Sequence, residues 1–435
     1  MNGIVAFALV VAAAAPPEPL TLEGAMTWAR EHAPAAGSAE AQAIIARARV
    51  DVARATRWPT VSGALGFGAG ASNSHGLIGD EVCADPALGI CSQSRAFADV
   101  DGSASVDVRW TVFDFGRRAS SISAAELGAD AAALDAQANS DQLAAAAAVA
   151  FLSASANEEL HRARVEMVER RALSLKFAEE RVRLGVAPPI EATRSRISFE
   201  SARLDTATAA AAVDDAHASL ARALGLDPGK RFTLAPYVER AVDDDPGRAA
   251  ELAAANRPEL RAQQKRIAAS DADVDGARAD FWPSLSASLG ASARIAGYSS
   301  QSPSGAEGAN AGLVLSVPIF DLTTGASVRA AEAAAAVGRA AERERALAVR
   351  ADAAQAAIAV RAQQQALASV RLLVGEAEAN LALAEGRYQE GAGSLLELVD
   401  AQTQQSSAQL ALAQSRFQVA VAQTRLLAAT ASLGG

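Results

Sequence analysis

The chain repeats itself at an interval of more than 200 residues. The segment ARATRWPT at 53–60 returns as ARADFWPS at 277–284, an offset of 224 residues (277 − 53). Two later echoes, among them RVRLG at 181–185 with RYQEG at 387–391, lie 207 and 206 residues apart. One loop of the first half is therefore 17 to 18 residues longer than its counterpart. Such a repeat is too long for a solenoid unit and indicates a duplicated module, whose two copies do the same structural job.

Alanine supplies much of the apolar content. Hydrophobic residues make up 50% of the 435 residues, but aromatic residues only 4%. Because alanine fills little volume, we expect long, thin helical layers in place of one large core. The net charge of −10 argues against nucleic acid as a partner.

The first 15 residues read as a secretory signal peptide (1–15). An apolar run and small residues precede Pro16, although the usual positive n-region is missing. A short transmembrane anchor is the alternative, but the run is too short to span a bilayer. Cys83 and Cys91 share one loop, and in an exported protein a disulfide between them is favoured over free thiols or a metal site.

Four segments alternate apolar and polar residues with a period of two, which is typical of β-strands. They cover about 60–72, 100–113, 284–296 and 310–320. Each has one apolar and one hydrophilic face and could cross a bilayer when tilted. A half-buried sheet of a soluble domain is the alternative, but the apolar face has few large side chains. Four strands cannot close such a barrel and open edges are forbidden in lipid, so we expect a barrel shared between chains.

Strong helix formers fill most of the remainder. Long helices are predicted at about 117–183 and 324–389, return helices at about 190–224 and 395–430, and shorter helices at about 22–57 and 248–280, broken near Pro34 and Pro258. The predicted organisation is a first repeat at 16–224, an inter-repeat linker at 225–247 and a second repeat at 248–435. The predicted fold class is mainly α with a small membrane β-barrel.

Several short motifs stand in a fixed order along the chain. They are Trp58-Pro59 and Trp282-Pro283, FDFG at 113–116 with its echo Phe320-Asp321, NRPEL at 256–260, and the turn from Arg387 to Gln402. With this order and spacing, the chain resembles the TolC-type outer-membrane efflux proteins (outer membrane factors) over essentially its whole mature length. The resemblance implies a homotrimer in the outer-membrane lipid, with a trimeric 12-stranded β-barrel joined to a 12-helix α-helical tunnel in the periplasm. It also implies two partners, a periplasmic adaptor (membrane fusion) protein and an inner-membrane pump.

The resemblance further implies roles for residues at the distal turns. Glu397 and Asp400 match acidic positions that ring the tunnel entrance; a solvated helix face is the alternative, because acidic residues are common in first helical turns. Tyr388 and Glu191 match two members of a network that holds the tips closed. The arginine partner of that network is absent, because Gly393 stands in its place, and Pro188-Pro189 also departs from the usual turn. We therefore expect a closed state held less tightly than in relatives that have the arginine.

The two turns themselves are the predicted adaptor-contact tips. They centre on Gly185 with Val186 and on Gly391 with Ala392. Glycine at such a turn also has the plain role of a helix C-cap, and both readings can hold together.

Catalysis is not indicated. The four histidines lack metal-ligand spacing, and neither a nucleophile elbow nor a phosphate loop is present, so no cofactor and no catalytic residue are expected. The predicted function is a passive exit duct of a tripartite efflux system for drugs, metal ions or other small solutes. Two alternatives remain: the outer-membrane component of type I protein secretion, and a periplasmic coiled-coil structural or adaptor protein.

Overall fold

The computed structural model describes residues 16–77, 92–237, 241–298 and 301–433. The predicted signal peptide and the predicted pair of Cys83 with Cys91 lie outside these residues. Within them, one order of elements occurs twice: two helices, two strands, a long helix and a shorter helix.

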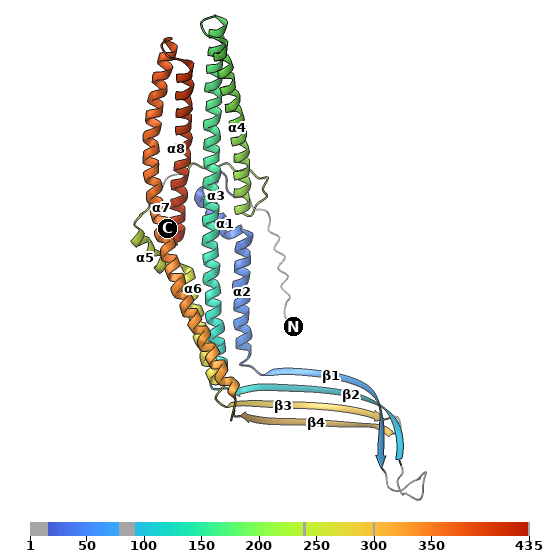
Figure 1. Cartoon of the computed structure of the whole chain (residues 1–435). Helices are drawn as coiled ribbons and strands as arrows, with labels where there is room; N and C mark the ends of the chain where they lie inside the picture. The colour runs from blue at the N-terminus through green and yellow to red at the C-terminus, as the bar shows by residue number, and fades with distance from the viewer. Residues whose placement is uncertain (1–15, 78–91, 238–240, 299–300, 434–435) are drawn as a thin grey trace. The chain divides into compact units, whose positions relative to one another are not determined.

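The elements are labelled in Figure 1. The first run consists of α1 (Leu22–His32), α2 (Pro34–Ala55), β1 (Thr60–Leu77), β2 (Ser92–Phe113), α3 (Arg117–Arg183) and α4 (Pro189–Ala223). The second run consists of α5 (Pro246–Asn256), α6 (Pro258–Ala279), β3 (Ser284–Tyr298), β4 (Gln301–Ser316), α7 (Leu322–Gln389) and α8 (Leu395–Ala429). Among the described helices, none combines the length and the apolar character needed to cross a lipid bilayer.

The strand limits differ from the predicted ones. β4 ends at Ser316, so the prediction of a strand through 320 is wrong. Pro318 has no N–H to donate to a ladder, and Asp321 instead accepts a hydrogen bond from the N–H of Thr323 (2.7 Å) at the start of α7. β1, β2 and β4 are also longer than predicted. Their extra residues pair backbone to backbone without a long apolar alternation, so the period-two pattern did not reveal them.

The chain forms two compact units. The first, called here the helical unit, comprises residues up to 45, 130–265 and from 339 onward. The second, the strand unit, comprises 46–129 and 266–338 and contains all four strands.

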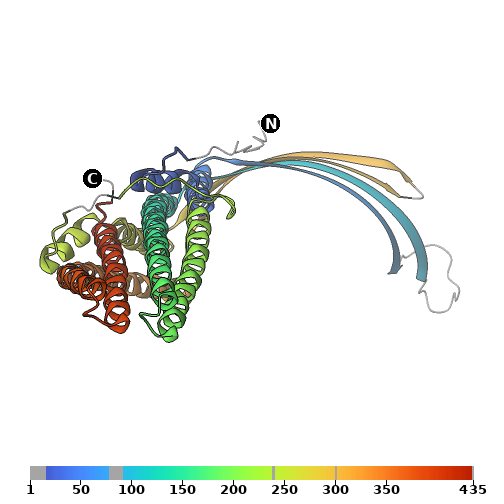
Figure 2. The same cartoon turned by 90° about the horizontal axis from the view of Figure 1, so that it is seen from above.

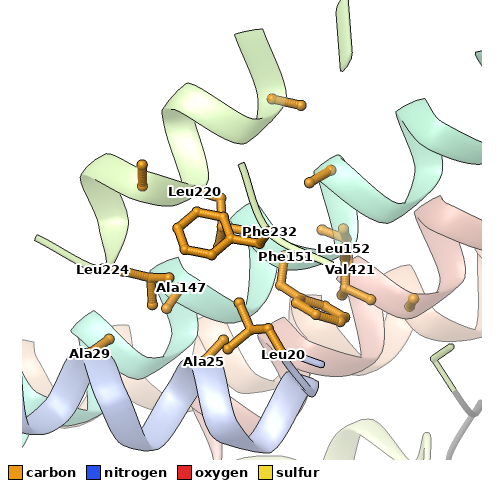
Figure 3. Close-up of a cluster of buried hydrophobic side chains, with 14 residues drawn as sticks. Leu20, Ala25, Ala29, Ala147, Phe151, Leu152, Leu220, Leu224, Phe232 and Val421 are labelled. Carbon is orange, nitrogen blue, oxygen red and sulfur yellow. The ribbon is translucent and has the colours of Figure 1, made fainter. Parts of the chain in front are cut away.

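The core of the helical unit gathers around Phe151 of α3, which is fully buried. Figure 3 shows its ring close to Leu20, with Leu220 and Phe232 beside them. Alanines at the helix contacts, such as Ala147, let the backbones approach closely. A few large side chains and many alanines therefore make this core, in agreement with the alanine-rich composition.

Backbone hydrogen bonds attach the segment that follows α4 to this core. The N–H of Leu20 donates to the carbonyl of Thr233 (2.9 Å), and the N–H of Ala235 donates to the carbonyl of Leu20 (2.8 Å). His217 is buried, and its Nδ1 accepts a hydrogen bond from the N–H of Phe232 (3.4 Å). Its Nε2 lies 2.9 Å from Glu158 of α3. This histidine therefore has a structural role, and it helps to hold part of the predicted 225–247 linker against the helices.

Gly225 shows why α4 ends where it does. Its φ is +73°, a left-handed conformation that favours glycine. A Cβ at this position would lie 2.6 Å from Cδ of Pro34, at the start of α2. The residue therefore serves both the turn and the close approach of the two segments.

The strand unit is built on one antiparallel sheet in the order β1-β2-β3-β4. Its register places apolar residues on one face, for example Val61 opposite Val108, which lies opposite Leu289. The other face carries Asp101 and Asp107, together with Arg109 and Arg294. Among the side chains described, Glu307 on β4 is the single charged group on the apolar face. β1 and β4 have no partner on their outer edges among the described residues.

A buried arginine connects α3 to α8 within the helical unit. Arg171 is 6% exposed and donates to Oε1 of Gln402 and to Oγ1 of Thr403, both at 3.1 Å. The amide of Gln402 in turn donates to Oγ of Ser174 (3.1 Å). Burial lowers the pKa of the Arg171 guanidinium, which has only neutral partners in this network. The network fixes the register of the two helices by polar contacts that only this alignment satisfies.

Replacing this side chain should loosen the contact between α3 and α8. In Arg171→Met, the carbonyl of buried Gln402 loses its donor, at a cost of about 1–3 kcal/mol. We expect a lower thermal midpoint and faster amide hydrogen exchange around 171 and 402. Arg170→Met, at an exposed neighbouring position, is the control and should leave both quantities unchanged. Equal behaviour of the two variants would show that the network contributes nothing.

Candidate functional site at the helix tips

The two predicted tips have the same backbone geometry. Gly185 and Gly391 both adopt left-handed φ, at +73° and +76°. Beyond them, the N–H of Val186 donates to the carbonyl of Arg181 (3.0 Å), and the N–H of Ala392 donates to the carbonyl of Arg387 (2.9 Å). This six-residue closure is the Schellman motif, which satisfies the last carbonyls of α3 and α7. The glycines therefore do serve as C-caps.

The tips also expose apolar side chains. Leu184 and Val186 flank the first glycine and are both exposed, and Leu396 is exposed just after the second turn. Isolated exposed apolar residues are common, but several at one end of paired helices form a candidate contact surface.

Tyr388 and Glu191 lie together, as their positions in the predicted network require. The Tyr388 hydroxyl donates to Oε2 of Glu191 at 3.4 Å, and the tyrosine is 4% exposed. Burial raises the pKa of the Tyr388 phenol, and the neighbouring Glu191 carboxylate raises it further. The phenol therefore keeps its proton at neutral pH and can act as the donor.

A guanidinium that the sequence analysis missed completes this cluster. The Arg181 guanidinium carbon lies 4.7 Å from the centre of the Tyr388 ring, a cation–π contact that joins α3 to α7. Phe177 packs beside the same ring, with 6.3 Å between the ring centres. The signal was present in the repeat, because Arg181 corresponds to Arg387 at the offset of 206.

Gly393 has a packing reason for lacking a side chain. A Cβ there would lie 3.0 Å from Cβ of Arg387 and 3.1 Å from backbone atoms of the same turn. The tight turn after α7 therefore disfavours an arginine at position 393, and the cation at this tip comes from α3.

The predicted acidic pair opens α8. Glu397 and Asp400 are both exposed, and their spacing of three places them on one face of the helix. The N–H of Glu397 donates to Oγ of Ser394, the N-cap residue (3.2 Å). Arg387 lies 3.8 Å from the Glu397 carboxylate, whereas Asp400 has no ion-pair partner among the described residues. Arg387 therefore partly offsets the charge of Glu397, whereas the charge of Asp400 is not offset by a described residue.

A second polar cluster lies in the strand unit, where the Trp-Pro and Phe-Asp motifs meet. Trp282 stacks on Phe115 with 5.3 Å between the ring centres, and Arg118 forms an ion pair with Asp114 at 2.6 Å. The indole N–H of Trp110 donates to the carbonyl of Arg57 (2.9 Å). These contacts fix the turns at the ends of the strands. Throughout the described part of the chain, we find no group of three or more His, Cys, Asp or Glu side chains suited to a metal ion.

Known structures have the same fold. The chain superposes on the outer-membrane channel OprN with a TM-score of 0.74 at 22% identity, covering 94% of this chain and 90% of that one. For CusC the TM-score is 0.77 at 19% identity, with 94% and 91% covered. For the open state of the MtrE outer membrane channel of Neisseria gonorrhoeae it is 0.71 at 20% identity, with 95% and 89% covered. These proteins share the fold of this chain.

Sequence comparison identifies the family. Protein CyaE of Bordetella pertussis is 30% identical over 430 residues, which cover 95% of this chain and 85% of that protein. The family described as outer membrane efflux protein matches residues 27–226 and 249–432, one segment in each half. The chain belongs to the outer membrane efflux protein family.

Proposed function

We propose that this protein is a passive exit duct in the outer membrane, with its helices in the periplasm, for drugs, metal ions or other small solutes. An inner-membrane pump and a periplasmic adaptor would hand over the solute. The observation that carries the proposal is the four-stranded sheet, which has one apolar face and one charged face, and whose two edges are unpaired among the residues that the structure describes. Such a sheet suits lipid on one side and a wet lumen on the other, provided that other chains complete it.

Exposed apolar stripes on the helices support a homotrimer. On α4, Ile190, Ile197 and Leu204 are spaced by seven residues and are 56%, 64% and 70% exposed. On α7, Leu347, Ile358, Leu372 and Leu383 are also exposed. A heptad-spaced stripe is typical of a helix that packs on a partner helix. In a ring of chains, α4 of one protomer would cover α7 of the next, while β4 would pair with the next β1.

A charge in the α4 stripe should break this assembly. In Ile197→Asp, a carboxylate replaces an apolar side chain that the trimer buries, and we expect at least a tenfold loss of association in detergent. Light scattering after size exclusion would measure the mass, and planar-bilayer recording would measure the loss of conductance. Ala210→Asp places the same charge at a half-exposed position of α4, about 120° around the helix from Leu204, and should remain trimeric. A monomeric, non-conducting wild type would reject the duct.

We propose that Arg181, Tyr388 and Glu191 hold the tip closed. Arg181 takes the place of the arginine missing at position 393. Arg181→Gln removes the cation–π contact and Glu191→Gln weakens the acceptor, so both should give larger or more frequent single-channel openings. Arg183→Gln, which removes an exposed guanidinium of the same turn, is the control. If all three variants gate like the wild type, the cluster does not close the tip.

We propose that Glu397 and Asp400 form an acidic ring at the entrance, where a concentration of carboxylates favours cations. Asp400→Asn should move the reversal potential in a salt gradient toward lower cation selectivity. Glu397→Gln should have a smaller effect, because Arg387 already offsets that charge. Arg387→Gln should act in the opposite direction and raise cation selectivity. Unchanged reversal potentials in all three would place the pair away from the permeation path.

We propose that Gly185, Val186, Gly391 and Ala392 contact the adaptor. Gly185→Asp and Gly185→Asn should cause similar backbone strain at positive φ, but only aspartate adds a charge to the apolar tip. We expect both to assemble and conduct, while Gly185→Asp alone abolishes export in cells. Export that persists in an assembled Gly185→Asp protein would rule out docking at this turn.

A further inference from the structure

A groove of about 660 Å³ lies in the helical unit, between α3, α8, an arginine of α7 and the segment that follows α4. Figure 2 shows the red helix α8 between the teal α3 and the orange α7. Apolar side chains of Leu152 and Phe417 form part of its lining, and Tyr237 closes one side. The Tyr237 hydroxyl donates to Oε1 of Gln423 (3.3 Å), which fixes the position of that ring.

The groove has an excess of positive charge. Among the residues that the structure describes, its lining includes Arg162 of α3, Arg371 of α7 and Arg416 of α8, but one carboxylate only, that of Glu159. Three guanidinium groups against one carboxylate leave two positive charges, in a chain whose net charge is −10. Arg164, which lies outside the groove, is by contrast neutralised by Asp205 at 2.9 Å.

The three arginines are available to a ligand. Arg416 lies 3.6 Å from Glu159, and both side chains are half-exposed. Nε of Arg162 donates to the backbone carbonyl of Glu158 (3.4 Å) and has no acidic partner among the described residues. Arg371 is exposed and has no ion-pair partner in the described part of the chain.

We propose that this groove docks an acidic peptide segment of a partner protein. Two carboxylates of the segment would neutralise the excess charge on the rim, because the guanidinium fork binds carboxylates through two parallel hydrogen bonds. An apolar side chain between them would rest on Phe417 and Leu152. The volume lies in the range of specific binding sites, and the exposed rim allows a continuous chain to pass. None of the groove's residues belongs to the helix tips, to the strands or to the exposed apolar stripes of α4 and α7.

The proposal is tested by fluorescence anisotropy on the full-length protein in detergent. The probe is a dye-labelled hexapeptide of alternating glutamate and leucine, and the matched probe replaces glutamate by lysine. We expect saturable binding of the glutamate peptide only, weakening as salt is raised. Arg371→Glu and Arg416→Glu should each weaken it at least tenfold.

Arg350→Glu is the control, because it reverses an exposed charge on α7 that lies 21 residues before Arg371. It should bind the peptide like the wild type, and all variants should keep the wild-type mass and conductance. Absence of binding by the wild type, or equal binding by Arg371→Glu, overturns the proposal. Displacement by citrate at the same carboxylate concentration also overturns it, since the groove would then be a site for small anions. Loss of conductance by itself bears on the duct and not on this groove.

Discussion

The unpaired backbone groups along the outer edges of β1 and β4 are the constraint on which the proposed assembly depends. A sheet of four long strands exposes a row of N–H and C=O groups on each edge, and these groups must be paired wherever water is excluded. The apolar face cannot be covered from within the same sheet, because its opposite face is charged. Identical chains that close the sheet into a ring would pair both edges and leave the apolar face to lipid. The same ring would cover the exposed stripes of α4 and α7.

Much of the secondary structure could be read from the sequence because its signals are local. Runs of helix formers without proline extend over α3 and α7, and the helices break next to Pro34 and Pro258 as expected. The strand ends could not be read this way. The ladder of β1 with β2 continues from Ala69↔Val100 to Leu77↔Ser92, where pairing and not alternation defines the strand. At β4, the apolar residues after Pro318 continue the alternating pattern, although the strand has already ended. Pro318 has no N–H to donate to the ladder.

The candidate site was predictable only where the repeat or the resemblance pointed to it. The proximity of Tyr388 and Glu191 followed from matching positions, and their hydrogen bond gives it a physical form. Arg171 was out of reach, because its partners Gln402 and Thr403 lie more than 230 residues away and depend on the register of α3 against α8. Neither the composition nor the hydrophobic periodicity of the sequence determines that register. The basic groove could not be predicted from the sequence either, since its arginines come from three different helices.

The two tips show how one backbone can carry two different charge arrangements. Both copies place an arginine four residues before the glycine and a glutamate six residues after it. In the second copy, Arg387 lies near Glu397 of the same helix pair, so it offsets charge locally. In the first copy, Arg181 instead contacts Tyr388 of the other pair, and Glu191 accepts the hydrogen bond of the same tyrosine. Tyr388 stands at the position that Val182 occupies in the first copy. This difference between the two copies creates the contact between the two helix pairs. Losing Arg181 should therefore affect how the pairs hold together, whereas losing Arg387 should alter only the local charge beside Glu397.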